Sequence, residues 1–181
     1  FHKTLDEYFV VNIICEMKYL RKATLSLVTS HEMVAGIIRR VGLHKSKVRV
    51  IPNFIIEDTW APPHRPRDLL EKKLVIGFVG RLTKQKNLIN LVHAVQGLGA
   101  TIKLYGEGEQ RDELKSICNE LGIDITLHGN CPQREVAEGL RTCDVFVLPS
   151  IYEGHPKALI EAMALGIPVV ASDSVGIRGL V

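Results

Sequence analysis

Short apolar runs alternate with segments of helical periodicity along most of this sequence, and this alternation is its strongest constraint on the fold. The segments between the runs carry apolar stripes with charged outer faces. Such alternation is typical of an α/β protein with a parallel, Rossmann-like sheet and helices on both faces. Strands are predicted at residues 25–29, 48–51, 74–79, 101–105, 124–127, 145–148 and 168–171. Helices are predicted at residues 32–41, 88–98, 109–121, 133–142 and 156–165, with Gly122 as a C-cap.

A proline-rich segment interrupts this rhythm between residues 60 and 67 (WAPPHRPR). Three prolines in eight residues exclude a helix or an interior strand, so a linker is predicted there. We therefore expect residues 1–57 to be the end of a first domain, 58–67 the linker, and 68–181 most of a second domain. Because the sequence starts without methionine and stops after a turn-rich segment, we expect it to be part of a longer protein.

Composition and charge exclude several classes of protein. Hydrophobic residues make up 46% of the chain and charged residues 24%, as in a soluble globular domain. The formal net charge of +3 suits an anionic ligand, but no run of lysine or arginine indicates a nucleic-acid groove. No apolar run reaches the roughly 18 residues of a membrane span. The four cysteines form no C-x-x-C pair, so reduced thiols and a cytoplasmic location are predicted, without a metal site.

Glu161 is the only charged residue in the stretch from 158 to 172 (ALIEAMALGIPVVAS). The predicted helix around it is apolar on every side, which indicates a buried helix. An unpaired buried carboxylate is costly, so such a residue usually has partners. Two interpretations stay open from this feature alone. Glu161 is either a salt-bridged acid of the core or a carboxylate that binds the hydroxyl groups of a ligand.

The residues before this helix favour a ligand site. The predicted strand 145–148 is followed by a turn that contains Glu153, Gly154 and His155, and Pro156 suits the first position of a helix. We expect Gly154 to let the backbone turn tightly there. The free amide groups and the dipole at a helix start attract a phosphate, and ligands bind at this edge of parallel sheets. Glu161 then lies about 7.5 Å along the helix, within reach of a ribose.

The sequence from Glu153 onward, E-G-H-P-K-A-L-I-E-A-M-A-x-G-x-P-V-V-A-S, resembles the E-x7-E motif of family-four glycosyltransferases. These are retaining enzymes built from two facing Rossmann-like domains, an arrangement called GT-B. The resemblance implies that Glu161 holds the ribose of a nucleotide-diphosphate sugar and that Glu153 lies beside the transferred sugar. It also implies backbone contacts with the phosphates. The residues in question are His155, Pro156, Lys157 and Ala158, and Gly154 before them is also expected to belong to the donor site.

A second motif carries two cations five residues apart. Arg81 and Lys86 follow the predicted strand 74–79 and Gly80, and such cations are able to face a diphosphate. Taken alone, they are also compatible with ordinary solvated loop residues. The segment resembles the G-R-L-x-x-x-K-N signature of the same family, which implies that Arg81 and Lys86 bind the donor diphosphate.

Three further turns follow predicted strands. Gly106 belongs to a G-x-G pair that lacks the third glycine of a dinucleotide fingerprint, so the resemblance assigns it to the donor cleft instead. In the family, main-chain groups at this place meet the nucleobase, so His128, Gly129 and Asn130 are candidates for that contact. The turn around Gly176 resembles a glycine-rich turn of the family, but the usual pair of glycines reads Val175-Gly176 and the usual acid after Arg178 reads Gly179.

The resemblance therefore implies transfer of a sugar from a UDP-, GDP- or ADP-linked donor to a glycan or lipid-linked glycan, with retention of configuration. Glu153, Arg81 and Lys86 are the expected catalytic residues, and no cofactor or metal is expected. Peripheral membrane contact is expected through the part of the first domain that lies outside this sequence. A nucleotide-sugar epimerase of the same architecture and a binding module without turnover remain alternatives. The chain by itself is expected to bind donor weakly and to transfer little.

Overall fold

The computed structural model describes residues 17–55, 57–61 and 73–181. The chain divides into two compact units, Phe1–Asn53 and Phe54–Val181. Within the described ranges, no helix has both the length and the apolar character that crossing a membrane requires.

The first unit pairs two parallel strands under a helix. β1 (Ser26–Val28) and β2 (Val48–Val50) are joined by α2 (His31–Val41) and by the 3-10 turn η1 (Lys45–Lys47). The Ser30 side chain caps α2 by accepting a hydrogen bond from the Met33 amide, and Gly42 ends it in the left-handed conformation. The predicted strands and helix of this unit are confirmed to within one residue. Its core consists of Val28, Val41, Leu43 and Val48.

The second unit is built on a five-stranded parallel sheet with the order β5-β4-β3-β6-β7. The strands are β3 (Val75–Val79), β4 (Thr101–Tyr105), β5 (Asp124–Gly129), β6 (Val145–Leu148) and β7 (Val169–Ala171). All five were predicted, and β5 runs two residues further than expected. Within this sheet, the chain enters at the central strand β3, continues outward through β4 to β5 and then crosses to β6 on the other side of β3. The strand order therefore reverses between β3 and β6, where open α/β sheets bind their ligands.

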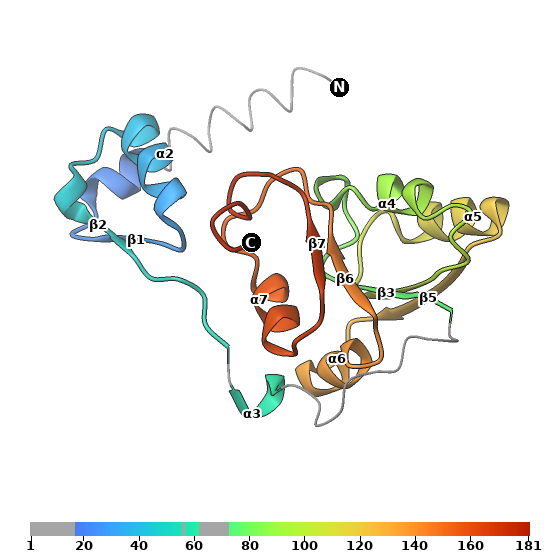
Figure 1. Cartoon of the computed structure of the whole chain (residues 1–181). Coiled ribbons are helices and arrows are strands. Elements are labelled where there is room, and N and C mark those ends of the chain that lie inside the picture. The colour runs from blue at the N-terminus through green and yellow to red at the C-terminus, as the bar shows by residue number, and fades with distance from the viewer. Residues whose placement is uncertain (1–16, 56, 62–72) are drawn as a thin grey trace, which may run out of the picture. The chain divides into compact units, whose positions relative to one another are not determined.

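Helices cover both faces of this sheet (Figure 1). α4 (Leu88–Ala94) and α5 (Arg111–Leu121) lie on one face, and α6 (Gln133–Leu140) and α7 (Lys157–Ala164) lie on the other. Gly122 is the left-handed C-cap of α5, as predicted. This arrangement confirms the predicted α/β, Rossmann-like fold.

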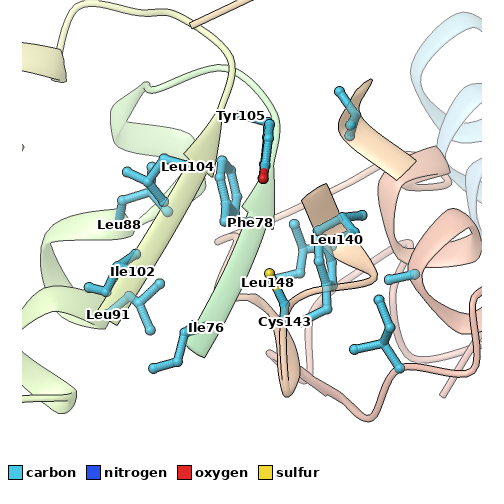
Figure 2. Packing of buried hydrophobic residues seen from close by; sticks show 14 of the residues in the cluster. Ile76, Phe78, Leu88, Leu91, Ile102, Leu104, Tyr105, Leu140, Cys143 and Leu148 are labelled. Carbon is cyan, nitrogen blue, oxygen red and sulfur yellow. The ribbon is translucent and has the colours of Figure 1, made fainter. Parts of the chain in front are cut away.

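The core of the second unit fills the space between sheet and helices. Figure 2 shows Leu88 and Leu91 of α4 beside Ile102 and Leu104 of β4, and it shows Leu140, Cys143 and Leu148 close to one another; all of them belong to one buried cluster. Burial of one such leucine or isoleucine stabilises the fold by about 1.5–3 kcal/mol. The sheet is therefore a rigid support for the loops at its edge.

Several expectations differ from the structure. α5 begins at Arg111 rather than at 109, and α6 ends at Leu140 rather than at 142. α4 ends at Ala94 rather than at 98, because Gly97 and Gly99 adopt left-handed backbone that no helix contains. The unit boundary follows Asn53, and Trp60 of α3 (Glu57–Trp60) is buried in the second core, so part of the expected linker packs as structure. The remainder of that linker, residues 62–67, lies outside the described residues. Finally, α7 is not buried on every side, since Met163 is exposed.

Candidate functional site

The loops that follow β3, β4 and β5 are joined to one another at the carboxyl edge of the sheet. The Gly80 amide donates to the Tyr105 carbonyl at 2.9 Å, and the Gly106 amide donates to the Gly129 carbonyl at 2.7 Å. The Leu82 amide adds a bond of 2.9 Å to the Glu107 carbonyl. These main-chain bonds fix the segments that carry the predicted site residues of the N-terminal half of the sheet, among them Gly80, Gly106 and Gly129.

A pocket of about 260 Å³ opens between these loops. Its lining includes Gly80, Arg81, Gly106 and Asn130, all of them named as candidates from the sequence, together with Cys131. The two predicted glutamates do not line it. The structure therefore places the predicted residues in two neighbouring groups, one around this pocket and one around the start of α7.

Gly106 allows two loops to approach more closely than any side chain permits. Its φ is 131°, and a Cβ built on it lies 2.1 Å from the Gly80 carbonyl oxygen. Gly108, the second glycine of the pair, has the same relation to Leu82, whose carbonyl oxygen lies 2.3 Å from a Cβ built there. The G-x-G sequence thus shapes the site through backbone packing.

His128 is the extra residue of a β-bulge in β5. Leu104 pairs with Leu127 and Tyr105 pairs with Gly129, so His128 has no partner in β4. Its ring stacks on Tyr105, with the centroids 4.3 Å apart and the planes inclined by 3°. Burial lowers the pKa of His128, and the charge of Lys103 lowers it further. Burial likewise raises the pKa of Tyr105 to about 12. At neutral pH the pair is therefore an uncharged aromatic stack beside the pocket.

Lys86 and Glu153 meet where the loops after β3 and β6 come together. The Lys86 Nζ forms an ion pair with the Glu153 Oε1, and these side chains are only 13% and 10% exposed. Arg81 differs, since it is exposed and has no ion pair in the described part of the chain. The two cations predicted to act alike are thus in unlike environments.

Several contacts of the Glu153 loop were not predicted. The Ser150 Oγ donates to the Glu153 Oε1 at 2.6 Å, and the Ser172 Oγ donates to the Ser150 carbonyl. Gln85 holds the same loop through both its side chain, which donates to the Tyr152 carbonyl, and its own carbonyl, which accepts from the Ile151 amide. The one sequence signal for them is that Ser150 and Ser172 come shortly after adjacent strands.

The start of α7 leaves its first amide groups without a side-chain cap. Pro156 is the N-cap residue and not, as predicted, the first residue of the helix. The helix therefore begins one residue later, at Lys157. His155 lies in the bend before it, and Ala158 belongs to the first turn. Gly154 lies in the same bend, and its φ is not left-handed. The glycine with that backbone in this region is Gly176, at φ 82°.

Glu161 is buried, as predicted, with 6% of its surface exposed. Its nearest charged partner is Lys157, one turn earlier, with the Nζ 3.7 Å from the Oε1. That distance is too long for a hydrogen bond, and the described residues supply no other partner. Burial raises the pKa of Glu161, and Lys157 offsets part of that effect. The carboxylate thus keeps its capacity to accept hydrogen bonds.

Because the pKa of Glu161 is raised, ionisation of this carboxylate is expected to lower the stability of the fold as the pH rises. A group whose pKa is higher in the folded state favours folding below its ordinary pKa of 4.5, and this contribution is lost as the pH rises through the folded pKa. Glu161→Gln does not ionise, so we expect the stability of this variant relative to wild type to increase across that pH range. Urea unfolding between about pH 4 and pH 8 measures the difference. Glu138→Gln, at an exposed glutamate on α6, is the control, and an equal pH profile for both variants would contradict the prediction.

Metal ligands do not gather at this site. In residues 17–55, 57–61 and 73–181, no three histidine, cysteine or acidic side chains form a group that is able to hold an ion.

The comparisons with known proteins agree on one family. Residues 63–181 match the family model described as glycosyl transferases group 1. The putative glycosyltransferase EpsF of Bacillus subtilis (strain 168) is 31% identical over 147 residues, which are 74% of this chain and 38% of that protein. The UDP-Gal:alpha-D-GlcNAc-diphosphoundecaprenol alpha-1,3-galactosyltransferase of Escherichia coli is 30% identical over 179 residues, 90% of this chain and 46% of that protein.

A solved structure agrees with this result. The sucrose-phosphate synthase from Thermosynechococcus elongatus superposes with a TM-score of 0.80 at 25% identity, over 93% of this chain and 45% of that chain. The present chain thus spans less than half the length of these relatives. Because the family model covers more than half of the chain, including the whole carboxyl edge of the sheet, the chain belongs to the glycosyl transferases group 1 family.

Proposed function

We propose that this chain supplies the donor site of a glycosyltransferase that moves a sugar from a nucleotide-diphosphate sugar to an acceptor hydroxyl, with retention of configuration. The observation that carries the proposal is the buried Glu161, whose carboxylate accepts no hydrogen bond from the described residues and lies about one turn behind the uncapped start of α7. A carboxylate in such a position is costly unless a ligand uses it.

The diphosphate would lie against the start of α7. The amides of Lys157 and Ala158 belong to the first turn, where the helix dipole favours an anion. Arg81 is exposed at the neighbouring pocket and adds a planar, bidentate donor. Lys86 adds a positive charge at the loop after β3. These groups would stabilise the charge that develops on the leaving diphosphate.

The ribose and the base of the nucleoside would occupy two separate sites beside the diphosphate. The ribose hydroxyls are placed at Glu161, as donors to its carboxylate. The base would occupy the pocket beside Gly80 and Gly106, whose lining includes Tyr105, the aromatic ring that stacks on His128. The name of the E. coli relative specifies a UDP-linked sugar, which supports uridine as the first nucleoside to test.

The chemistry follows from this placement. The bond between the anomeric carbon and the diphosphate oxygen breaks, and the acceptor oxygen bonds to that carbon on the same face. The acceptor proton passes to the departing phosphate oxygen, so no protein nucleophile is needed. Glu153 would orient the sugar. The family membership and the lipid-linked substrate in the name of one relative support a glycan or lipid-linked glycan as acceptor.

Calorimetry with nucleoside diphosphates tests the donor site. We expect UDP, GDP or ADP to bind the 181-residue chain, and Glu161→Ala or Arg81→Ala to weaken that binding by about tenfold or more, because each removes a charge-assisted hydrogen bond. Arg134→Ala and Glu138→Ala, at an exposed ion pair on α6, are the matched controls. Absence of binding, or equal binding by all variants, would show the assignment to be wrong.

The alternatives predict other results with the same protein. A binding module would hold the nucleotide sugar but would not transfer the sugar to any acceptor, even in a protein as long as the relatives that carries these residues. An epimerase would change the configuration of the bound sugar without an acceptor, which thin-layer chromatography of the recovered nucleotide sugar detects.

A further inference from the structure

The Glu153 carboxylate is held through one of its two oxygens. Both the Lys86 ammonium and the Ser150 hydroxyl donate to Oε1. Among the residues that the structure describes, none donates to Oε2. A carboxylate oxygen accepts hydrogen bonds only, so Oε2 suits the hydroxyl of a ligand.

Ser150 is itself held rigidly. Ser150 is fully buried, and its carbonyl accepts a hydrogen bond from the Ser172 hydroxyl. The two serines come just after the parallel strands β6 and β7, where Leu148 pairs with Ala171. The Ser172 amide also donates to the Leu148 carbonyl at 3.1 Å. The sheet register therefore determines where the Ser150 hydroxyl lies.

The turn after β7 fixes the Glu153 backbone as well. The Glu153 amide donates to the Val175 carbonyl at 2.9 Å. Gly176 packs so closely that a Cβ on it would lie 2.1 Å from the Glu153 carbonyl oxygen. The segment from Ser172 to Gly176 thus holds both the backbone and, through Ser150, the side chain of Glu153.

We propose that Ser150, held by Ser172, is a positioning residue that fixes the Glu153 carboxylate so that its Oε2 accepts a hydroxyl of the donor sugar. This inference rests on the proposed function and extends it to a residue that touches neither nucleotide nor sugar. It separates two parts of the site. The nucleoside diphosphate is bound by Glu161, Arg81 and the start of α7, and the sugar depends on the Ser172–Ser150–Glu153 connection.

The test compares each nucleotide with its sugar conjugate, by calorimetry on the 181-residue chain. The probes are UDP with UDP-galactose and UDP-glucose, and GDP with GDP-mannose. We expect Ser150→Ala to weaken binding of the preferred nucleotide sugar by roughly three- to tenfold, the effect of one lost hydrogen bond, and to leave binding of the free diphosphate within about twofold. Ser116→Ala is the control, because it removes a serine–glutamate hydrogen bond on the surface of α5.

A double-mutant cycle distinguishes positioning from a general structural role. If Ser150 acts through Glu153, then Ser150→Ala has no further effect on sugar binding in a Glu153→Gln background. Should Ser150→Ala fail to fold, Ser150→Cys replaces it, since a thiol is of similar size but is a weak donor.

Three results would overturn the inference. Equal loss of diphosphate and sugar-conjugate binding would mean that Ser150 merely supports the loop, and additive effects in the cycle would mean that it does not act through Glu153. In both cases the proposed function would stand. If the wild-type chain binds none of the nucleotides, the proposed function fails and the inference fails with it.

Discussion

Alanine at position 106 is expected to lower the free energy of unfolding of the second unit by about 4 kcal/mol or more. Two independent penalties act there. The φ of 131° is a backbone conformation that L-residues avoid, and the added Cβ would lie 2.1 Å from the Gly80 carbonyl oxygen. Neither neighbour is free to move, because Gly80 and Gly106 are both tied by main-chain hydrogen bonds to the adjacent loops.

Other glycines of the second unit separate the two penalties. Gly99 has a φ of 62° with nothing within 4 Å of a built Cβ, so Gly99→Ala carries the backbone penalty alone. Gly108 has no left-handed φ, but its Cβ would lie 2.3 Å from the Leu82 carbonyl oxygen, so Gly108→Ala carries the steric penalty alone. Gly179 has neither feature, and Gly179→Ala is the neutral reference.

Urea unfolding of the four variants gives the expected order. Gly106→Ala loses most, Gly99→Ala about 1 kcal/mol, and Gly179→Ala less than about 0.5 kcal/mol. Gly108→Ala falls between the first two. If Gly106→Ala is no less stable than Gly99→Ala, then the loops after β3 and β4 do not lie as closely together as the structure shows.

These same glycines illustrate what the sequence is able to predict. The strands and most helix positions follow from short-range periodicity, and the C-cap at Gly122 follows from a local rule. The G-x-G sequence likewise marked Gly106 as a special position. Its physical reason was not predictable, because the Gly80 carbonyl that it packs against belongs to another strand.

Contacts between distant loops account for the remaining differences. Lys86 and Glu153 are 67 residues apart, and Ser150 and Ser172 are 22 apart. No periodicity relates such pairs, and only the strand order β3-β6-β7 brings them together. The burial of Glu161 was predictable, since a single charge in an apolar helix is unusual on its own. The exposure of Met163 was not, because it depends on which neighbours cover the helix.

Replacing Lys86 by methionine is the second change with a large expected effect, a loss of about 3 kcal/mol in the free energy of unfolding. Methionine keeps the length of the side chain and removes its charge. The Glu153 carboxylate, only 10% exposed, would then be a buried anion with the Ser150 hydroxyl as its remaining hydrogen-bond donor among the described residues. The cost arises from this uncompensated charge.

Arg81→Met is the matched control, since it removes the other cation of the same loop. Arg81 is exposed and forms no ion pair with any described residue, so its replacement is expected to change stability by less than about 0.5 kcal/mol. Both variants are expected to weaken UDP binding under the proposed function. Only Lys86→Met is expected to weaken the fold, as measured by urea unfolding without ligand.

The double variant Lys86→Met with Glu153→Gln decides whether the ion pair is the cause. Since glutamine carries no charge, the double variant leaves no buried anion, and we expect it to recover most of the stability that Lys86→Met loses. If Glu153→Gln brings no recovery, then methionine disturbs the packing of η2 (Lys84–Lys86) rather than an ion pair. Recovery of stability without recovery of UDP binding would show that Lys86 has two separable roles. It neutralises Glu153 in the free protein, and it attracts the diphosphate when the donor binds.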